Sequence, residues 1–325
     1  MRFLRFGTTL LSVAALLSST AQALDIVLSN DDGWAELNIR ELYNALTAEN
    51  HSVVISAPAY DNSGKGSKDK PPTYLRAPGE FNSLPFGAPP TGFNQSQPRF
   101  NYVNSYPATS MKHGIDVVAP KFFDGNKPDL AVAGVNVGRN MGIGDTFSGT
   151  YGCALMADSM GVPAIAFSAG TGDQISWETT PVPMYVQLYS DLAVKIIDTL
   201  VANEQPWMNP GTFIAVNFPR VGSECPHWGA VENPQCTKVE DFKFILTSAN
   251  SWGRWFPKDV FTCGAKTLPN DVWIMDTLMR KEDGCYVTIT VMNRSRFNAD
   301  PPEQSTVKEN LRSILSCLPD SKGPL

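Results

Sequence analysis

The sequence has little of several features that define common protein classes. Its six cysteines include no C-x-x-C pair, so a zinc ribbon or a thioredoxin-like redox site has no support. It has only three histidines, His51, His113 and His227, which is a poor supply for a histidine-based metal site or nucleophile. Beyond residue 23, no apolar run approaches the ~18 residues that a membrane-spanning helix needs. We therefore expect a protein that does not cross a membrane.

Positive charge is also scarce. The formal net charge is −6 and the sequence pI is about 5.2, and no block of Lys or Arg interrupts the chain. Such a chain lacks the basic surface by which proteins bind duplex nucleic acid or anionic membranes, so we expect neither as a partner. If the protein binds phosphate, it must do so with a local site.

The N-terminal segment has the composition of a secretory signal peptide. Two arginines precede a short apolar run, and Ala21-Gln22-Ala23 supplies an A-x-A cleavage site. We predict that residues 1–23 are removed after Ala23 and that the protein is secreted; an uncleaved membrane anchor is the alternative. Three Asn-x-Ser/Thr sequons are candidates for glycosylation: Asn50, Asn94 and Asn293.

The six cysteines fit an oxidising compartment. Six cysteines can pair in 15 ways, so short sequence separations are the only guide to their connectivity. On that basis we expect the bridges Cys225–Cys236 and Cys263–Cys285, and either Cys153 or Cys317 can be free.

Apolar patterns predict an α/β fold. Leu24–Ser29 and Ser52–Ser56 have the β-branched, apolar character of buried strands, and Ile39–Glu49 between them has the spacing of an amphipathic helix. A strand–helix–strand unit of this kind predicts parallel pairing. Further strands are expected at 129–133, 164–168, 213–217 and 286–292, and further helices at 150–160, 186–203 and 307–318.

We therefore predict a Rossmann-like three-layer sandwich with a mostly parallel sheet over residues 24–220. Within it, residues 58–110 are rich in Pro, Gly, Ser and Asn and are expected to be a long, loop-dominated insertion. From residue 221 to 325, cysteines, turns and alternating strands predict a β-rich extension that ends in a closing helix.

Four polar loops come after predicted parallel strands: 30–33, 58–67, 134–142 and 148–150. In an open doubly wound sheet, ligands bind beyond the carboxyl ends of the strands, so these loops are expected to meet in one crevice. Asp31 and Asp32 stand there side by side, an arrangement that is costly unless a cation neutralises it. With Ser63 and Asn136 they form an all-oxygen ligand set, which suits Mg²⁺, Mn²⁺ or Ca²⁺.

The segment Ser148-Gly149-Thr150 opens a predicted helix, and a helix N-terminus is a ready site for phosphate. A divalent cation beside a phosphate site is the minimal equipment for transferring a phosphoryl group to water, with one carboxylate of the Asp31–Asp32 pair as base. Taken singly, each motif also fits a plain turn or a helix cap. Their occurrence together favours metal-dependent hydrolysis of phosphomonoesters.

The same residues resemble those of the SurE family of survival-protein phosphatases and nucleotidases. The matching motifs are Ser-Asn-Asp-Asp-Gly (29–33), Ala-Pro-x₄-Ser-Gly (57–64), Ala-Gly-Val-Asn-x-Gly-x-Asn-x-Gly (133–142), Phe-Ser-Gly-Thr-x-Gly (147–152) and Gly-Val-Pro-Ala-Ile-Ala-Phe-Ser (161–168). Weaker motifs further on resemble the family's fungal-type secreted acid phosphatases. The resemblance implies phosphate release from nucleoside monophosphates or other phosphomonoesters by dimers or higher oligomers. It implies a metal at Asp31, Asp32, Ser63 and Asn136, and phosphate binding at Asn140, Ser148, Gly149 and Thr150.

The loop after Ser63 departs from the bacterial type of the family, which continues with small hydroxyl residues. Here the loop contains Lys65 and Lys68, which either contact phosphate or are solvated loop lysines. The aromatic residues Trp34, Tyr106 and Phe147 either stack on a nucleobase or pack internally.

Three other functions were weighed. Lys112-His113-Gly114 lacks the flanks of the R-H-G-x-R-x-P pattern of histidine acid phosphatases, so His113 is expected to be structural. A serine esterase built on Ser148 lacks the G-x-S-x-G context and has only His227 downstream. A non-catalytic, secreted protein that binds a cation or another ligand is the third, because fold alone does not imply catalysis.

Overall fold

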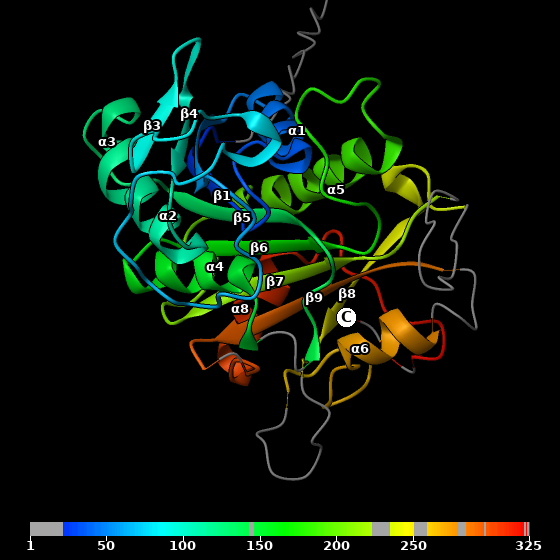
Figure 1. Cartoon of the computed structure of the whole chain (residues 1–325). Coiled ribbons are helices and arrows are strands. Elements are labelled where there is room, and N and C mark those ends of the chain that lie inside the picture. The colour runs from blue at the N-terminus through cyan, green and yellow to red at the C-terminus, as the bar shows by residue number, and fades with distance from the viewer. Residues whose placement is uncertain are drawn as a thin grey trace, which may run out of the picture.

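The computed structural model describes residues 22–142, 146–222, 235–249, 259–278, 284–295, 297–321, 323 and 325. Its strands are β1 (Asp25–Ser29), β2 (Ser52–Pro58), β3 (Thr91–Asn94), β4 (Gln97–Val103), β5 (Leu130–Val137), β6 (Ala164–Ala169), β7 (Thr212–Phe218), β8 (Phe242–Thr247) and β9 (Cys285–Asn293). They form a nine-stranded sheet in the order β3-β4-β2-β1-β5-β6-β7-β9-β8 (Figure 1). Only the β3–β4 and β7–β9 pairs are antiparallel.

Helices cover both faces of this sheet. They are α1 (Leu37–Ala48), α2 (Pro107–His113), α3 (Ala119–Phe122), α4 (Gly149–Ser159), α5 (Met184–Val201), α6 (Asp271–Trp273) and α8 (Pro301–Asn310). Single 3-10 or π-helical turns lie at Glu80–Asn82, Gly114–Val118, Val239–Asp241 and Ile274–Leu278. None of the helices in the described ranges has the length and apolar character needed to cross a membrane.

The strand sequence explains the three layers. Ile26 and Leu28 of β1 belong to the larger hydrophobic core, which also contains the apolar residues of α1 and α5. Val27, between them, belongs to the smaller core with residues of α2 and α4. All three side chains are fully buried, as expected for a parallel strand covered on both faces. The predicted α/β sandwich with a mostly parallel sheet is confirmed.

The sheet has its topological switch point at β1. This strand pairs in parallel with β2 on one side and with β5 on the other, so the chain runs outward in both directions from it. Loops that leave β1 and β5 at their carboxyl ends therefore separate and leave room for a ligand. Asp31 and Asp32 lie on the first of these loops.

Two expectations from the sequence are wrong in detail. The loop-dominated stretch 58–110 contains β3 and β4, and β4 extends the sheet by pairing in parallel with β2. β3 is the edge strand and β4 lies between β3 and β2. The residues of β3 and of the first half of β4 are exposed or half-buried and lack the apolar run of a central strand. The closing helix, expected at 307–318, is α8, which starts at Pro301 because the Glu303 carboxylate accepts the Asp300 N–H (2.8 Å) at its first turn.

The expected disulfide pairing is also wrong. The bridges are Cys236–Cys285 and Cys263–Cys317. Parallel pairing of β8 with β9 places Phe242 opposite Cys285, so the segment leading into β8 passes beside the start of β9. The paired cysteines are 49 and 54 residues apart in the sequence, so a prediction based on short separations does not find them. Cys153 is free and buried, and Cys225 lies outside the described residues.

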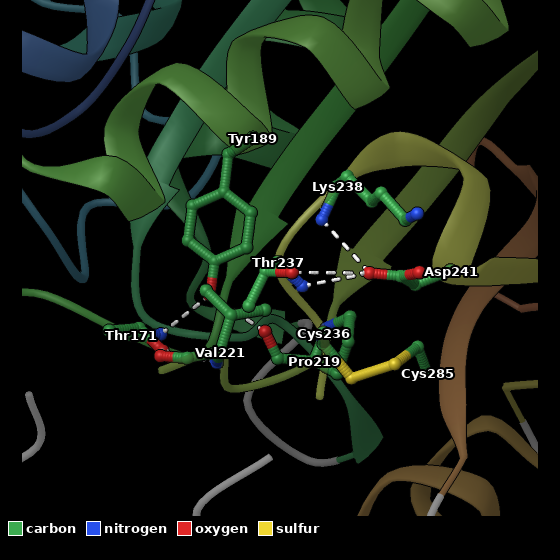
Figure 2. The surroundings of a disulfide bond; sticks show 9 residues. All are labelled: Thr171, Tyr189, Pro219, Val221, Cys236, Thr237, Lys238, Asp241 and Cys285. Atoms are coloured by element: carbon green, nitrogen blue, oxygen red, sulfur yellow. Dashed lines mark hydrogen bonds between the residues drawn. A yellow bond between two sulfur atoms is a disulfide. The ribbon is translucent and has the colours of Figure 1, made fainter. Parts of the chain in front are cut away.

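Figure 2 shows what surrounds the Cys236–Cys285 bridge. The Tyr189 hydroxyl of α5 donates to the Pro219 carbonyl (2.7 Å) and accepts the Thr171 N–H (3.2 Å). Next to the bridge, Asp241 accepts the backbone N–H groups of Thr237 and Lys238. The disulfide thus joins the start of β9, which pairs antiparallel with β7, to a turn that is stabilised by its own hydrogen bonds.

Removing this bridge should destabilise the protein. We expect Cys236→Ala/Cys285→Ala to lower the free energy of unfolding by about 2–4 kcal/mol, because the unfolded chain regains the freedom of a long loop. Urea denaturation followed by circular dichroism measures the change. Cys153→Ala, which deletes a buried sulfur without breaking a bridge, is the control; equal midpoints for the double variant and the native protein would contradict the expectation.

Candidate active site

Asp31 and Asp32 lie in a tight turn directly after β1. Asn30 closes the turn, because its Nδ2 donates to the Gly33 carbonyl (2.9 Å) and its Oδ1 accepts the Gly33 N–H (3.2 Å). Gly33 has φ +120°, a conformation that other residues rarely adopt. The turn directs both aspartates inward, and they are 3% and 0% exposed.

Asp31 is held by a chain of side chains from three other elements. The Thr150 hydroxyl in the first turn of α4 donates to Asp31 Oδ1 (2.7 Å). Asn140 Nδ2 donates to that hydroxyl (3.2 Å) and to Ser168 Oγ at the end of β6 (2.8 Å). Thr150 and Ser168 are fully buried and Asn140 is 9% exposed. Both amide hydrogens of Asn140 are thus engaged, one by the Thr150 hydroxyl and the other by Ser168.

Asp32 is held by the end of β5 and by a segment that follows β6. Its Oδ2 accepts the backbone N–H of Val137 at the end of β5 (2.9 Å), and its Oδ1 accepts Nε2 of Gln174 (2.8 Å). Both donors are neutral amides. They fix the direction of the carboxylate without cancelling its charge.

The two carboxylates are buried, and the described residues place no positive side chain against them. Within the described parts of the chain, neither forms an ion pair with Lys or Arg. Burial raises the pKa of Asp31 to about 6, and burial together with the charge of Asp31 raises the pKa of Asp32 well above its usual range. Glu36, fully buried at the start of α1, also contributes to the raised pKa of Asp32, and burial raises its own pKa to about 8. A bound cation is the partner that such a site lacks.

The remaining predicted ligands come from the ends of β2 and β5. The Asn62 N–H donates to the Asp31 carbonyl (2.8 Å), which brings the loop with Ser63 to the aspartate turn. Ser63 is exposed, and both its N–H and its hydroxyl donate to Asp61. Asn136 Nδ2 donates to the Gly138 carbonyl (2.6 Å), and its Oδ1 makes no hydrogen bond within the described residues.

This donor set fits a hard cation. Among the described residues no cluster of three His, Cys, Asp or Glu side chains could hold a metal ion, so any cation here would need neutral oxygen ligands beside the aspartates. Ser63 and Asn136 offer such oxygens, and Mg²⁺, Mn²⁺ and Ca²⁺ prefer them. The fit is therefore to one of these ions rather than to Zn²⁺.

The N-terminus of α4 lies against Asp31. Ser148 caps the helix, since its Oγ accepts the Tyr151 N–H (3.0 Å). A Cβ atom on Gly149 would lie 2.8 Å from Asp31 Cβ and 2.9 Å from Asp31 Oδ2, so only glycine permits this approach. A Cβ on Gly152 would overlap the Gly66 carbonyl oxygen, which shows how closely the 65–66 loop covers the same helix turn. The first turn of α4 thus lies directly beside the acidic pair.

The lysine-containing loop lies next to this helix turn. The Gly66 N–H donates to the Phe147 carbonyl (3.0 Å), and Lys65 and Lys70 place their Nζ atoms 6.0 and 5.7 Å from the centre of the Tyr106 ring. The Phe147 side chain is 62% exposed. Trp34, by contrast, is a packing residue: it is 4% exposed, and its ring lies against that of Tyr102.

The histidines lie apart from the acidic pair. His51 directly precedes β2, so it lies at the amino ends of the strands, opposite the ends that carry the acidic pair. Its Nε2 forms a hydrogen bond with Asp198 Oδ1 (3.0 Å). His113 ends α2 and lines a surface cavity of about 340 Å³ with Asp69 and Lys112. His227 lies outside the described residues. Ser148, the nucleophile of the serine-esterase alternative, serves as the helix cap.

Gln174, Ser168 and Asn217 were missed by the sequence argument. Ser168 ends β6, Gln174 follows it, and Asn217, near the end of β7, accepts the Asn140 N–H (2.9 Å). The rule that identified the other loops, polar residues after a parallel strand, applies equally to β6 and β7. Applying it to these strands would have found Ser168 and Asn217.

Fold and site together define a class of protein: a doubly wound α/β protein with a buried, oxygen-rich acidic site at its switch point, beside a helix N-terminus. The family model described as "Survival protein SurE" matches residues 26–245. The chain belongs to the SurE family, as its sequence motifs predicted.

Curated relatives support this assignment over most of the chain. An acid phosphatase of Yarrowia lipolytica is 33% identical over 313 residues, which cover 88% of this chain and 84% of that protein. A 5'-nucleotidase SurE of Variovorax paradoxus is 35% identical over 145 residues, 45% of this chain and 49% of its own length. Both names denote hydrolases of phosphomonoesters. A crystal structure of the SurE protein from Aquifex aeolicus shares the fold, with a TM-score of 0.54, 23% identity, and coverage of 83% of this chain and 93% of that chain.

The burial of Asp31 has a measurable consequence in protein treated with a chelator. We expect Asp31→Asn to raise the free energy of unfolding at pH 7 by an amount on the order of 2 kcal/mol, because it removes an uncompensated buried charge. The asparagine Oδ1 can still accept the Thr150 hydroxyl. Urea denaturation in EDTA measures the change.

The sign of the pH dependence follows from the raised pKa. Between the unfolded pKa of about 3.8 and the folded pKa of about 6, the native state keeps a proton that the unfolded state has lost, so stability falls as pH rises. The slope contributed by Asp31 is about −1.4 kcal/mol per pH unit in that window, and Asp31→Asn should remove it. A variant with the native slope and no gain at pH 7 would show that the Asp31 charge is already compensated.

Proposed function

We propose that this chain is a phosphomonoesterase that depends on a divalent cation. The observation that carries the proposal is the pair of buried carboxylates beside the N-terminus of α4, which form no ion pair with the Lys and Arg residues that the structure describes. That combination supplies a place for a cation and a place for a phosphate group next to each other. The named relatives, an acid phosphatase and 5'-nucleotidases, support the same chemistry.

In this proposal Asp31, Asp32, Ser63 and Asn136 hold the cation through oxygen atoms. When bound, Mg²⁺, Mn²⁺ or Ca²⁺ supplies positive charge that polarises a phosphoryl oxygen and makes water more acidic. The chain's own neutral donors keep the two carboxylates oriented, and they leave the negative charge of the pair for the cation.

The phosphate group binds at the first turn of α4, at Ser148, Gly149 and Thr150. Backbone N–H groups at a helix N-terminus have no partner within the helix, and the helix dipole favours an anion there. Asn140 contributes by holding Thr150 in place, because both of its amide hydrogens point to protein acceptors. Its proposed role in phosphate binding is therefore indirect.

One carboxylate of the pair acts as general base. It accepts a proton from the attacking water as the water oxygen forms a bond to phosphorus and the bond from phosphorus to the ester oxygen breaks. The leaving oxygen takes up a proton to give the free alcohol.

Nucleoside monophosphates are the substrate class we propose within the phosphomonoesters. Tyr106 and the exposed Phe147 flank the loop that covers α4, and aromatic rings stack readily on bases. Lys65 and Lys70, close to the Tyr106 ring, add positive charge at the entrance. Lys68 is exposed and belongs to the same loop.

Chelation and a single substitution test the proposal. Purified protein should release phosphate from p-nitrophenyl phosphate and AMP, lose this activity in EDTA, and regain it with Mg²⁺ or Mn²⁺. Asp32→Asn should lower kcat by more than about 100-fold, since even the partners of metal ligands are worth 10–100-fold. The exposed Glu178→Gln is the matched control. Absence of phosphate release between pH 4 and 9 with every divalent cation would refute the enzyme and leave a binding protein.

We further propose that the protein is secreted after cleavage at Ala23, glycosylated, and assembled as a homodimer or higher oligomer. The two disulfides and the acid phosphatase relative are consistent with secretion. Of the three sequons, Asn50 is exposed, whereas Asn94 and Asn293 are half-buried and accept backbone N–H groups of their own turns. Asn50 is therefore the sequon most open to a glycan.

Expression in a eukaryotic secretory host tests this set of proposals. N-terminal sequencing of protein from the medium should begin at Leu24, and a glycosidase should lower its mass, with Asn50→Gln removing the largest share of that shift. Retention of protein in the membrane fraction, with an intact N-terminus, would favour the uncleaved anchor instead.

A further inference from the structure

Gln174 contacts the acidic pair from a segment that belongs to no helix or strand. It follows β6, and its half-buried side chain donates from Nε2 to Asp32 Oδ1 over 2.8 Å. Asp32 lies 142 residues earlier in the chain. The contact is charge-assisted on the acceptor side, which makes it one of the stronger hydrogen bonds available to a neutral donor.

The backbone next to Gln174 is fixed to the start of α1. The Leu37 N–H donates to the Ile175 carbonyl (2.9 Å), and the Trp177 N–H donates to the Ala35 carbonyl (3.0 Å), so the two segments pair antiparallel around Glu36 and Ser176. Residues 34–37, which lead into α1, come directly after the aspartate turn. The residues that follow Asp32 thus also fix the backbone beside Gln174, the donor of the hydrogen bond to Asp32.

A neutral amide suits position 174 better than a charged or an apolar side chain. A lysine or arginine there could also reach Asp32, but its charge would neutralise the carboxylate and compete with a cation. An apolar residue would leave Asp32 Oδ1 buried without a donor, at a cost that the carboxylate would relieve by rotating. A neutral amide avoids both outcomes. It orients the carboxylate and preserves its charge.

We propose that Gln174 is a positioning residue for Asp32, which sets the direction of the carboxylate toward the cation without lowering its charge. The inference rests on the proposed function, because it assigns Asp32 to the cation. Gln174 acts through Asp32 and does not itself touch the reacting atoms.

Two substitutions at position 174 distinguish an effect on the orientation of Asp32 from an effect on the local charge. Gln174→Met keeps the length of the side chain and removes the donor. Gln174→Lys keeps a donor and adds a charge. The exposed neighbour Asp173→Asn is the control. For each variant, Mn²⁺ binding to metal-free protein is measured by isothermal titration calorimetry, the Asp32 side chain is located in a crystal structure, and kcat and KM are measured separately.

We expect Gln174→Met to weaken Mn²⁺ binding about 10–100-fold, the range found for partners of metal ligands, and to lower kcat with little change in KM. Its Asp32 carboxylate should be rotated, whereas in Gln174→Lys it should keep its direction while Mn²⁺ binds more weakly still. An unrotated Asp32 in Gln174→Met, with Mn²⁺ affinity within twofold of the native protein, would overturn the proposal. If the native protein itself binds no Mn²⁺, the proposed function fails, and the direction of Asp32 in the Met variant still decides the role of Gln174.

Discussion

Two neighbouring carboxylates, those of Asp31 and Asp32, are enclosed at the end of β1 with no lysine or arginine paired to them in the described residues. Burying one charge without a partner is costly, and burying two side by side adds their repulsion. The surrounding structure does not reduce this cost by supplying positive side chains. It supplies neutral donors instead, from the Thr150 hydroxyl, the Val137 amide and the Gln174 side chain.

The parallel sheet makes this arrangement possible. The donors come from the ends of β5, β6 and the start of α4, segments more than a hundred residues from the aspartates in sequence. In a parallel sheet the carboxyl ends of neighbouring strands lie at one edge, so short loops suffice to bring them together. At the switch point the loops of β1 and β5 diverge, and the N-terminus of α4 occupies the space between them and the 65–66 loop.

Much of the fold and of the candidate site could be predicted from the sequence, because the patterns that produce them lie within short stretches of the chain. Buried parallel strands read as continuous apolar runs, as in β1 and β6, and polar residues directly after them belong to the ligand-binding edge. This reasoning identified Asp31, Asp32, Asn136 and Thr150. It did not identify Gln174, since a half-buried glutamine in an irregular segment has no pattern of its own and gains its meaning only from the pairing of Leu37 with Ile175.

The other errors have the same origin. Residues of β4 alternate too weakly to indicate a strand, and their pairing with β2 and β3 makes them part of the sheet. The bridge Cys236–Cys285 depends on the parallel register of β8 and β9, a long-range property that short sequence separations cannot reveal. For Trp34 the sequence left stacking on a base and internal packing both open, and the structure shows packing, with its ring on Tyr102 inside the core.

Glu36 shows that buried acidic groups extend beyond the pair. It caps α1 by accepting the Asn38 N–H (2.6 Å), its other oxygen has no hydrogen-bond partner within the described residues, and its carboxyl group contributes to the raised pKa of Asp32. A cap of this kind would serve equally well as serine or threonine if stability were the only requirement. Burial raises the pKa of Glu36 itself to about 8, so the metal-free protein holds it mainly as the uncharged acid near neutral pH. A cation at the proposed site would favour the charged form of Glu36, and it would then serve both the reaction and the neutralisation of a core that is otherwise too acidic.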